Sequence, residues 1–397
     1  MDLIQGYASS DDEAPPPLKR KARALDDHVV ELPPPLASAY KPKRRASSGA
    51  APTTAAPQPL PPVFTDARAE PWLVAAPVPS RELRRWKTEY RVNRVRWNPQ
   101  FPWLLASAGM HPTIDVWDAG CGTCARSLDQ PHTAAVKDLQ WSCDGRRLVS
   151  ASFDRTVGCV DVETGTVVAT HSGDHRFTAV AIHPTDANVV LVGDANGSIL
   201  SWDLRGSSIR AFGRSCGEVL ALAFLPGTDH LQFISSSTVT KTSAVEKAVL
   251  VWDYESGATV SKPIYGEGYS CSAVAVPTFS FPNAPNGRVH RSVPFVALQT
   301  HGNYIATVSA IKFQQLKARF TGHTAEGYGI DCAFNATGGL LATGDATGRL
   351  LVFDARRRHC VYTVSPHTHV CMAVQCHPAA PSVIATGGWD QSITIHA

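Results

Sequence analysis

Thr113-Ile114-Asp115-Val116-Trp117-Asp118 is the clearest copy of a pattern that recurs through this chain of 397 residues. Apolar and polar side chains alternate along it, as they do in a β-strand with one buried face. Fainter or equal copies follow at residues 157–161, 199–203, 249–253, 304–308, 350–354 and 393–396. The positions equivalent to Trp117 lie 42 to 56 residues apart. A repeat of this length predicts an array of similar structural units.

Each copy has similar surroundings, and these define the unit. A strand-like run precedes the copy, as at residues 147–152, and another run precedes that one, as at residues 136–141. A turn with a glycine such as Gly165 follows, and glycine supplies the positive φ of a tight turn. Four strands with their turns need about 40–45 residues, the length of one propeller blade. Residues 80–397 are therefore predicted to form an all-β, seven-bladed β-propeller, with insertions in blades four and five.

The seventh blade needs a strand from elsewhere. The sequence stops at Ala397, directly after the third strand expected for that blade. Residues 81–86 belong to no other blade, and we expect them to supply the outer strand of blade seven. This pairing would close the ring and leave no long unpaired sheet edge.

Residues 1–79 differ in composition from the rest of the chain. Fifteen of the 29 prolines lie here, and large apolar side chains are few. This composition predicts a disordered tail with polyproline II character. Two compact basic clusters in the tail are candidate nuclear import signals, with a solvated charge run as the alternative. They are Lys19, Arg20, Lys21 and Arg23, followed by Lys41, Lys43, Arg44 and Arg45. We expect a nuclear protein.

Composition and motifs narrow the classes of function. A net charge of +3 is too small to indicate a nucleic-acid partner by itself. The ten scattered cysteines indicate reduced thiols, and no apolar run has the length of a transmembrane helix. No phosphate-binding loop is present, so nothing indicates a bound nucleotide. We expect no cofactor, no small-molecule substrate and no membrane partner. Residues 356–358, three arginines, are either a solvated turn or a contact for an acidic partner or RNA.

Residues 80–397 resemble the WD-repeat family, on the repeats quoted above. Within it, residues 161–166, 322–328 and 377–386 are similar to the family of WD repeat-containing protein 25. The same residues resemble, more distantly, splicing factors of the pre-mRNA-processing factor 17 type, and residues 6–13 are similar to the start of both. The resemblance implies a propeller that binds other proteins in a nuclear ribonucleoprotein complex and carries out no chemistry of its own.

WD repeats often join a histidine, a serine or threonine and an aspartate in a buried hydrogen-bonded network. The resemblance implies two such structural networks, His132 with Ser152 and Asp154, and His367 with Thr386 and Asp390. They look like catalytic triads, but no nucleophile elbow or oxyanion-hole motif accompanies them, and we predict a protein that is not an enzyme. Residues 121–124 form a C-x-x-C without the second ligand pair of a metal site, so we expect no metal.

Trp202-Asp203-Leu204-Arg205 permits a second hypothesis. It resembles the element by which some propellers bind the adaptor of cullin-type ubiquitin ligases. Trp202, Asp203 and Arg205 are thus candidate adaptor contacts. The first hypothesis is a non-enzymatic scaffold for protein–protein interactions in a nuclear complex of pre-mRNA splicing, and the alternative is a substrate receptor of a cullin-type ligase.

Overall fold

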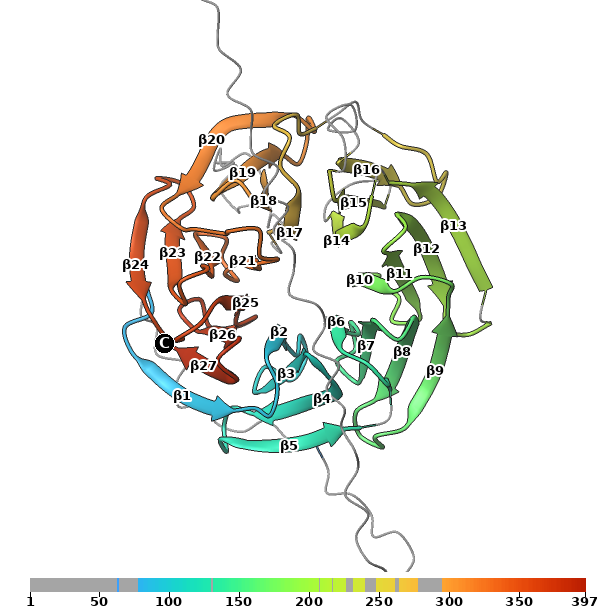
Figure 1. Cartoon of the computed structure of the whole chain (residues 1–397), viewed down its shortest axis with the longest axis horizontal. Helices are drawn as coiled ribbons and strands as arrows, with labels where there is room; N and C mark the ends of the chain where they lie inside the picture. Colours follow the sequence, from blue (N-terminus) through green and yellow to red (C-terminus); the bar gives the residue numbers. More distant parts are fainter. Residues whose placement is uncertain are drawn as a thin grey trace, which may run out of the picture. The chain divides into compact units, whose positions relative to one another are not determined.

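The computed structural model describes residues 63, 78–129, 131–206, 208–215, 217–225, 231–239, 248–260, 264–277 and 295–397. Every regular element among them is a β-strand. The strands form seven sheets, arranged as a ring within one compact unit that runs from Pro59 to Ala397 (Figure 1). The prediction of an all-β, seven-bladed propeller is confirmed. The predicted disordered tail lies outside the described residues, except for Val63, Val78 and Pro79.

Each blade is an antiparallel sheet that runs from an inner strand at the central axis to an outer strand (Figure 1). Six blades have four strands, and the described part of blade four has three. The strands of blades one to four are β2 (Val92–Trp97), β3 (Leu104–Gly109), β4 (His111–Asp118) and β5 (Thr123–Leu128); β6 (Val136–Trp141), β7 (Arg147–Ser152), β8 (Thr156–Asp161) and β9 (Val167–Ser172); β10 (Phe177–Ile182), β11 (Val189–Asp194), β12 (Ser198–Asp203) and β13 (Ser208–Arg214); β14 (Val219–Leu225), β15 (Gln232–Ser237) and β16 (Val249–Asp253). Those of blades five to seven are β17 (Cys271–Ala275), β18 (Phe295–Thr300), β19 (Tyr304–Ser309) and β20 (Gln315–Thr321); β21 (Cys332–Phe334), β22 (Leu340–Thr343), β23 (Leu350–Asp354) and β24 (Cys360–Val364); β25 (Cys371–Cys376), β26 (Ile384–Gly388), β27 (Ser392–His396) and β1 (Glu82–Lys87).

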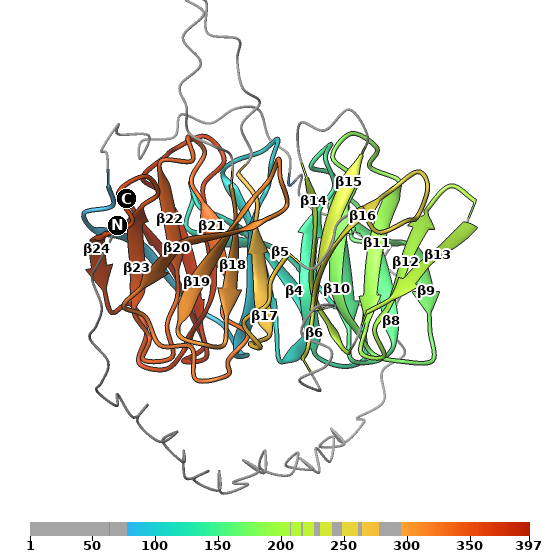
Figure 2. The same cartoon turned by 90° about the horizontal axis from the view of Figure 1, so that it is seen from above.

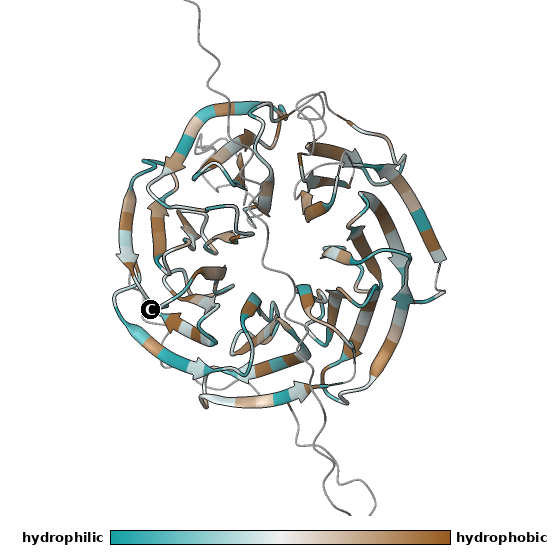
Figure 3. Cartoon of the chain, in the orientation of Figure 1, coloured by the Kyte–Doolittle hydropathy of each residue, from teal (hydrophilic) through white to brown (hydrophobic). Residues whose placement is uncertain are grey.

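The recurrent sequence pattern is the third strand of each blade. It forms β4, β8, β12, β16, β19, β23 and β27. In the six blades whose outer strand is described, these strands lie between the second and the outer strands. Their apolar residues are buried against the neighbouring blades, while the described outer strands carry both polar and apolar residues (Figure 3).

Blade seven combines residues from both ends of the propeller. β1 pairs antiparallel with β27, with Trp86 opposite Ile393. The backbone N–H groups of Ser80 and Arg81 donate to the carbonyl oxygen of Ala397, at 2.8 and 3.0 Å. The pairing covers the outer edge of β27 and joins the first blade-forming residues to the last.

The apolar core is divided among the seven seams between neighbouring blades, with a large buried cluster in each and a smaller one beside the seam between blades six and seven. In four seams an aromatic residue of the third strand faces a ring on the outer strand of the preceding blade. We call these two rings a seam pair. The pairs, with their centroid distances, are Trp86–Trp117 (5.3 Å), His171–Trp202 (5.9 Å), Phe212–Trp252 (6.5 Å) and Phe320–Phe353 (5.5 Å). Each pair ties an outer strand to the next blade.

Deletion of residues 81–87 should therefore lower the melting temperature by about 10 °C or more. The loss of a large buried aromatic side chain such as Trp86 costs about 3–5 kcal/mol, and each kcal/mol shifts Tm by about 2–4 °C in domains of comparable size. Thermal unfolding followed by circular dichroism measures the shift. Deletion of residues 46–52, the same number of residues from the tail, is the control and should leave Tm unchanged. An unchanged Tm after deletion of residues 81–87 would contradict the role of β1 in closing the ring.

Candidate functional site

The predicted network of blade seven is assembled around a buried histidine. His367 Nε2 lies 2.9 Å from Thr386 Oγ1, and its Nδ1 lies 3.0 Å from Asp390 Oδ1. Thr386 Oγ1 also lies 2.6 Å from Thr394 Oγ1, which in turn lies 3.1 Å from His396 Nε2. The Thr386 hydroxyl is thus enclosed in protein and shared between two strands. This geometry links the loop before β25 to β26 and β27.

The network of blade two contains a different serine from the one expected. His132 Nε2 lies 2.7 Å from Ser150 Oγ, and its Nδ1 lies 3.1 Å from Asp154 Oδ2. Ser152 instead donates to the carbonyl oxygen of Ala135 at 3.0 Å, so its assignment to the network was wrong. Ser150 and Ser152 point to the same face of β7, because side chains alternate along a strand. Burial lowers the pKa of His132, although the nearby Asp154 opposes this shift, so the imidazole is neutral at physiological pH.

The spacing to the aspartate would have identified this serine. Thr386 lies four residues before Asp390, and Ser150 lies four residues before Asp154. Sequence reasoning also missed the equivalent network of blade one, where a tyrosine replaces the histidine. There, Tyr90 Oη lies 2.9 Å from Ser107 Oγ, which accepts a hydrogen bond from the Trp117 indole at 2.8 Å.

The three candidate ligase contacts are not equally accessible. Trp202 is buried in the seam between blades two and three, with 2% of its surface exposed. Arg205 is exposed, and its guanidinium binds the carboxylates of Asp203 and Asp186, each at 2.9 Å. The structure therefore separates the buried tryptophan from the exposed Arg205, which follows the third strand of blade three. The candidate adaptor contact remains a prediction.

The remaining sequence candidates lie in a hairpin or outside the described residues. The import clusters, Lys19 to Arg23 and Lys41 to Arg45, lie outside the described residues. Cys121 lies in the turn between β4 and β5, whereas Cys124 is the second residue of β5, and burial raises the pKa of Cys124 to about 11. Within the described ranges, no group of three or more His, Cys, Asp or Glu side chains could hold a metal ion. No helix in this part of the chain has the length and apolarity to span a membrane.

A buried cluster of charges links the inner strands of blades one, two and three to the segment before the inner strand of blade six. Oδ1 of Asp138 on β6 accepts a hydrogen bond from Nε of Arg94 on β2 at 3.1 Å. The same oxygen lies 3.7 Å from Nη2 of Arg96. Arg96 Nη1 also donates to Asp331, which precedes β21 in blade six, at 2.7 Å. Asp138 accepts a further bond from the backbone N–H of Val180 on β10, at 3.0 Å. Burial alone would lower the pKa of Arg96, but Asp331 and Asp138 raise it overall and keep the guanidinium charged.

The loops before the inner strands and the loops after the second strands emerge on the same face, because each blade is antiparallel (Figure 2). In six blades the first residue after the second strand donates its backbone N–H to the carbonyl oxygen of the residue before the inner strand. The pairs, acceptor first, are Arg91–Met110, Ala135–Phe153, Arg176–Ala195, Glu218–Thr238, Ser270–His301 and Val370–Trp389. These residues lie at equivalent positions around the central axis on this face of the ring (Figure 1).

Arginine and aromatic side chains gather on this loop face. Arg91 lies over the Trp389 ring of the preceding blade at 5.6 Å, and Arg176 lies over the Phe153 ring at 5.4 Å. Tyr328 contacts the edge of Trp389, with ring centroids 5.4 Å apart. A hollow beside the second pair is lined by Phe153, Arg155, Asp174, His175, Arg176, Ala195 and Asn196. We refer to Arg91, Phe153, Arg176, Tyr328 and Trp389 as the rim cluster. It can provide positive charge beside flat apolar surface to a partner.

The fold and the repeat define the class of protein: the chain is a seven-bladed β-propeller that contains WD40 repeats. The family model described as WD domain, G-beta repeat, matches residues 122–161 and 314–354. The chain is 33% identical over 310 residues to WD repeat-containing protein 25 of Mus musculus, covering 77% of this chain and 55% of that protein. It is 25% identical to Pre-mRNA-processing factor 17 of Homo sapiens, over 80% of this chain and 52% of that protein. The protein of the same name from Saccharomyces cerevisiae is 28% identical, over 74% and 61%. The chain thus spans between half and two thirds of the length of these relatives.

Proposed function

We propose that this protein is a non-enzymatic scaffold that holds partner proteins together in a nuclear complex of pre-mRNA splicing. The rim cluster is the main support for the binding role, since arginine and aromatic residues dominate the energetics of protein–protein contacts. The similarity to the human and yeast proteins named Pre-mRNA-processing factor 17 supports the splicing context. The two basic clusters of the tail support a nuclear location.

The mechanism requires no chemical step. The rigid ring presents loops at fixed positions, and partners bound to one ring meet at a high effective concentration. Arg91 and Arg176 are exposed, whereas the rings beneath them are half-buried, so a partner would meet the cations first. An acidic segment of a protein is the partner chemistry that this surface favours.

The experiment is proximity labelling in cells with the full chain and with a variant that carries Arg91→Glu and Arg176→Glu. We expect enrichment of splicing proteins with the full chain and a fall of about tenfold or more with the variant, since each hot-spot residue contributes 1.4 kcal/mol or more. Arg205→Glu is the matched control, because Arg205 is an exposed arginine in a turn on the opposite face. Equal labelling by all three chains would contradict the role of the rim cluster.

The same labelling experiment tests the nuclear location and the alternative function as a substrate receptor. Replacement of the eight basic residues at positions 19–23 and 41–45 by alanine should move the protein to the cytoplasm while the propeller remains folded. Enrichment of cullin-ligase components that is lost in Arg205→Glu would instead favour the substrate receptor. A cytoplasmic profile of the full chain would contradict the nuclear proposal.

A further inference from the structure

The seam between blades one and two has no seam pair. Val160 occupies the position of the third-strand aromatic residue, and Leu128 occupies the facing position on the outer strand of blade one. The register establishes this equivalence: Leu128 pairs with Ile114, three residues before Trp117, as Trp86 pairs with Ile393, three residues before His396. Two aliphatic side chains therefore stand where four other seams have two rings. Without a further side chain, this seam would contain unfilled apolar space, which is costly.

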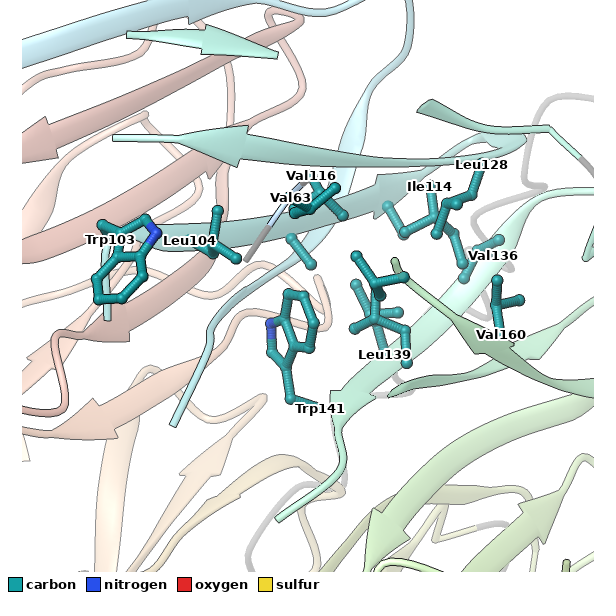
Figure 4. Packing of buried hydrophobic residues seen from close by; sticks show 14 residues of the cluster. Val63, Trp103, Leu104, Ile114, Val116, Leu128, Val136, Leu139, Trp141 and Val160 are labelled. Carbon is teal, nitrogen blue, oxygen red and sulfur yellow. The ribbon is translucent and has the colours of Figure 1, made fainter. Parts of the chain in front are cut away.

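Val63 lies in this seam, although it precedes β1 by 19 positions in the sequence. Its side chain is buried, with 5% exposed, in the cluster formed by Leu104, Val116, Leu139 and their neighbours. Figure 4 shows Val63 beside β4 among these side chains, and Trp141 belongs to the facing blade. A residue from outside the blades thus completes the core between blades one and two.

The seam between blades four and five follows the same rule. Val308 occupies its third-strand position, and again a residue from outside the strands is buried there. Tyr265 is 1% exposed in that cluster, and its hydroxyl lies 2.8 Å from the hydroxyl of Tyr304. In both seams where valine replaces the aromatic residue, a connecting segment contributes an apolar side chain. The burial of Val63 is therefore consistent with a space that the sequence of the blades leaves open.

We propose that Val63 anchors the chain before the propeller in the seam between blades one and two. The anchor sets the point from which the tail departs. Arg45, the last residue of the basic clusters, lies 18 residues before Val63 and 35 before Ser80. An extended chain spans at most about 3.5 Å per residue, so the anchor limits the reach of these clusters to about 60 Å from this seam. A receptor or partner that binds the basic clusters is consequently held within about 60 Å of this seam, about half the reach that the 35 residues before Ser80 would otherwise allow.

Thermal unfolding of the full chain tests the anchor. Val63→Asp should lower Tm by about 5–10 °C, because it places a carboxylate in an apolar seam. Val168→Asp is the matched control, since Val168 on β9 is half exposed, and its effect should remain below about 2 °C. Equal shifts for Val63→Asp and Val168→Asp would overturn the proposal.

Limited proteolysis of the full chain gives a second, independent test of the anchor. Phe64 directly follows the anchor, and chymotrypsin cleaves after phenylalanine. Cleavage at Phe64, measured by mass spectrometry, should be at least about tenfold slower in the native chain than in Val63→Asp, because an anchored segment cannot enter the protease cleft. Equal rates in the two chains would show that Val63 does not hold the segment.

Discussion

Asp138→Ala should lower the free energy of unfolding by about 3–5 kcal/mol, the cost of removing one partner from a buried ion pair. Asp138 is the shared counter-ion of Arg94 and Arg96, and the three side chains are only 5–12% exposed. Its loss leaves Arg94 without a carboxylate and Arg96 with Asp331 alone. The backbone N–H of Val180 loses its acceptor as well. The change therefore affects the inner strands of blades one, two and three together.

Urea unfolding measures this effect, with Arg205→Ala as the control. Arg205 also binds two carboxylates, but its side chain is 57% exposed, and exposed ion pairs contribute little to stability because water and salt screen them. Asp138→Asn keeps one acceptor oxygen, and its free energy of unfolding should lie between those of the other two variants. If Asp138→Ala and Arg205→Ala were equally stable, the charge cluster would not stabilise the inner strands.

This cluster shows why sequence reasoning reached the blades but not the contacts between them. A strand with a buried face leaves an alternating pattern within six residues, and the seven copies of that pattern mark the third strands. Arg96 and Asp331, by contrast, are 235 residues apart and meet only because the ring brings blades one and six to a common axis. A single sequence gives no signal for such a pair, since both are ordinary charged residues on predicted strands or loops.

The two histidine networks were predicted in part. Their histidines and aspartates were predicted, since each type stands at a fixed place in the repeat. Ser150 was missed because its hydroxyl shares one strand face with that of Ser152, and only a comparison with the four-residue spacing of Thr386 and Asp390 distinguishes the two serines. Val63 was missed for a related reason, since the space it occupies is visible only when the equivalent seams are compared.

Trp117→Asp should prevent the protein from accumulating in soluble form. Trp117 is 8% exposed, stacks on Trp86 at 5.3 Å and donates its indole N–H to Ser107 at 2.8 Å. Truncation of a buried tryptophan costs about 3–5 kcal/mol, and an unpaired carboxylate in the same place adds several more. The total approaches the whole stability of a typical domain, which is about 5–15 kcal/mol. Because this seam joins blade one to the closing strand of blade seven, Trp117→Asp removes the Trp86–Trp117 contact between these two blades.

Trp117→Phe distinguishes this explanation from a general sensitivity of the position. Phenylalanine keeps a ring for the seam pair and loses mainly the hydrogen bond to Ser107, so the variant should remain soluble with a Tm lowered by a few degrees. The soluble fraction and the circular dichroism spectrum of both variants are the measurements. A soluble, folded Trp117→Asp protein would mean that Trp117 does not occupy a seam, and the assignment of the third strand in blade one would be incorrect. If Trp117→Phe were also insoluble, the hydrogen bond to Ser107 would contribute far more to the seam than the stacking of its rings.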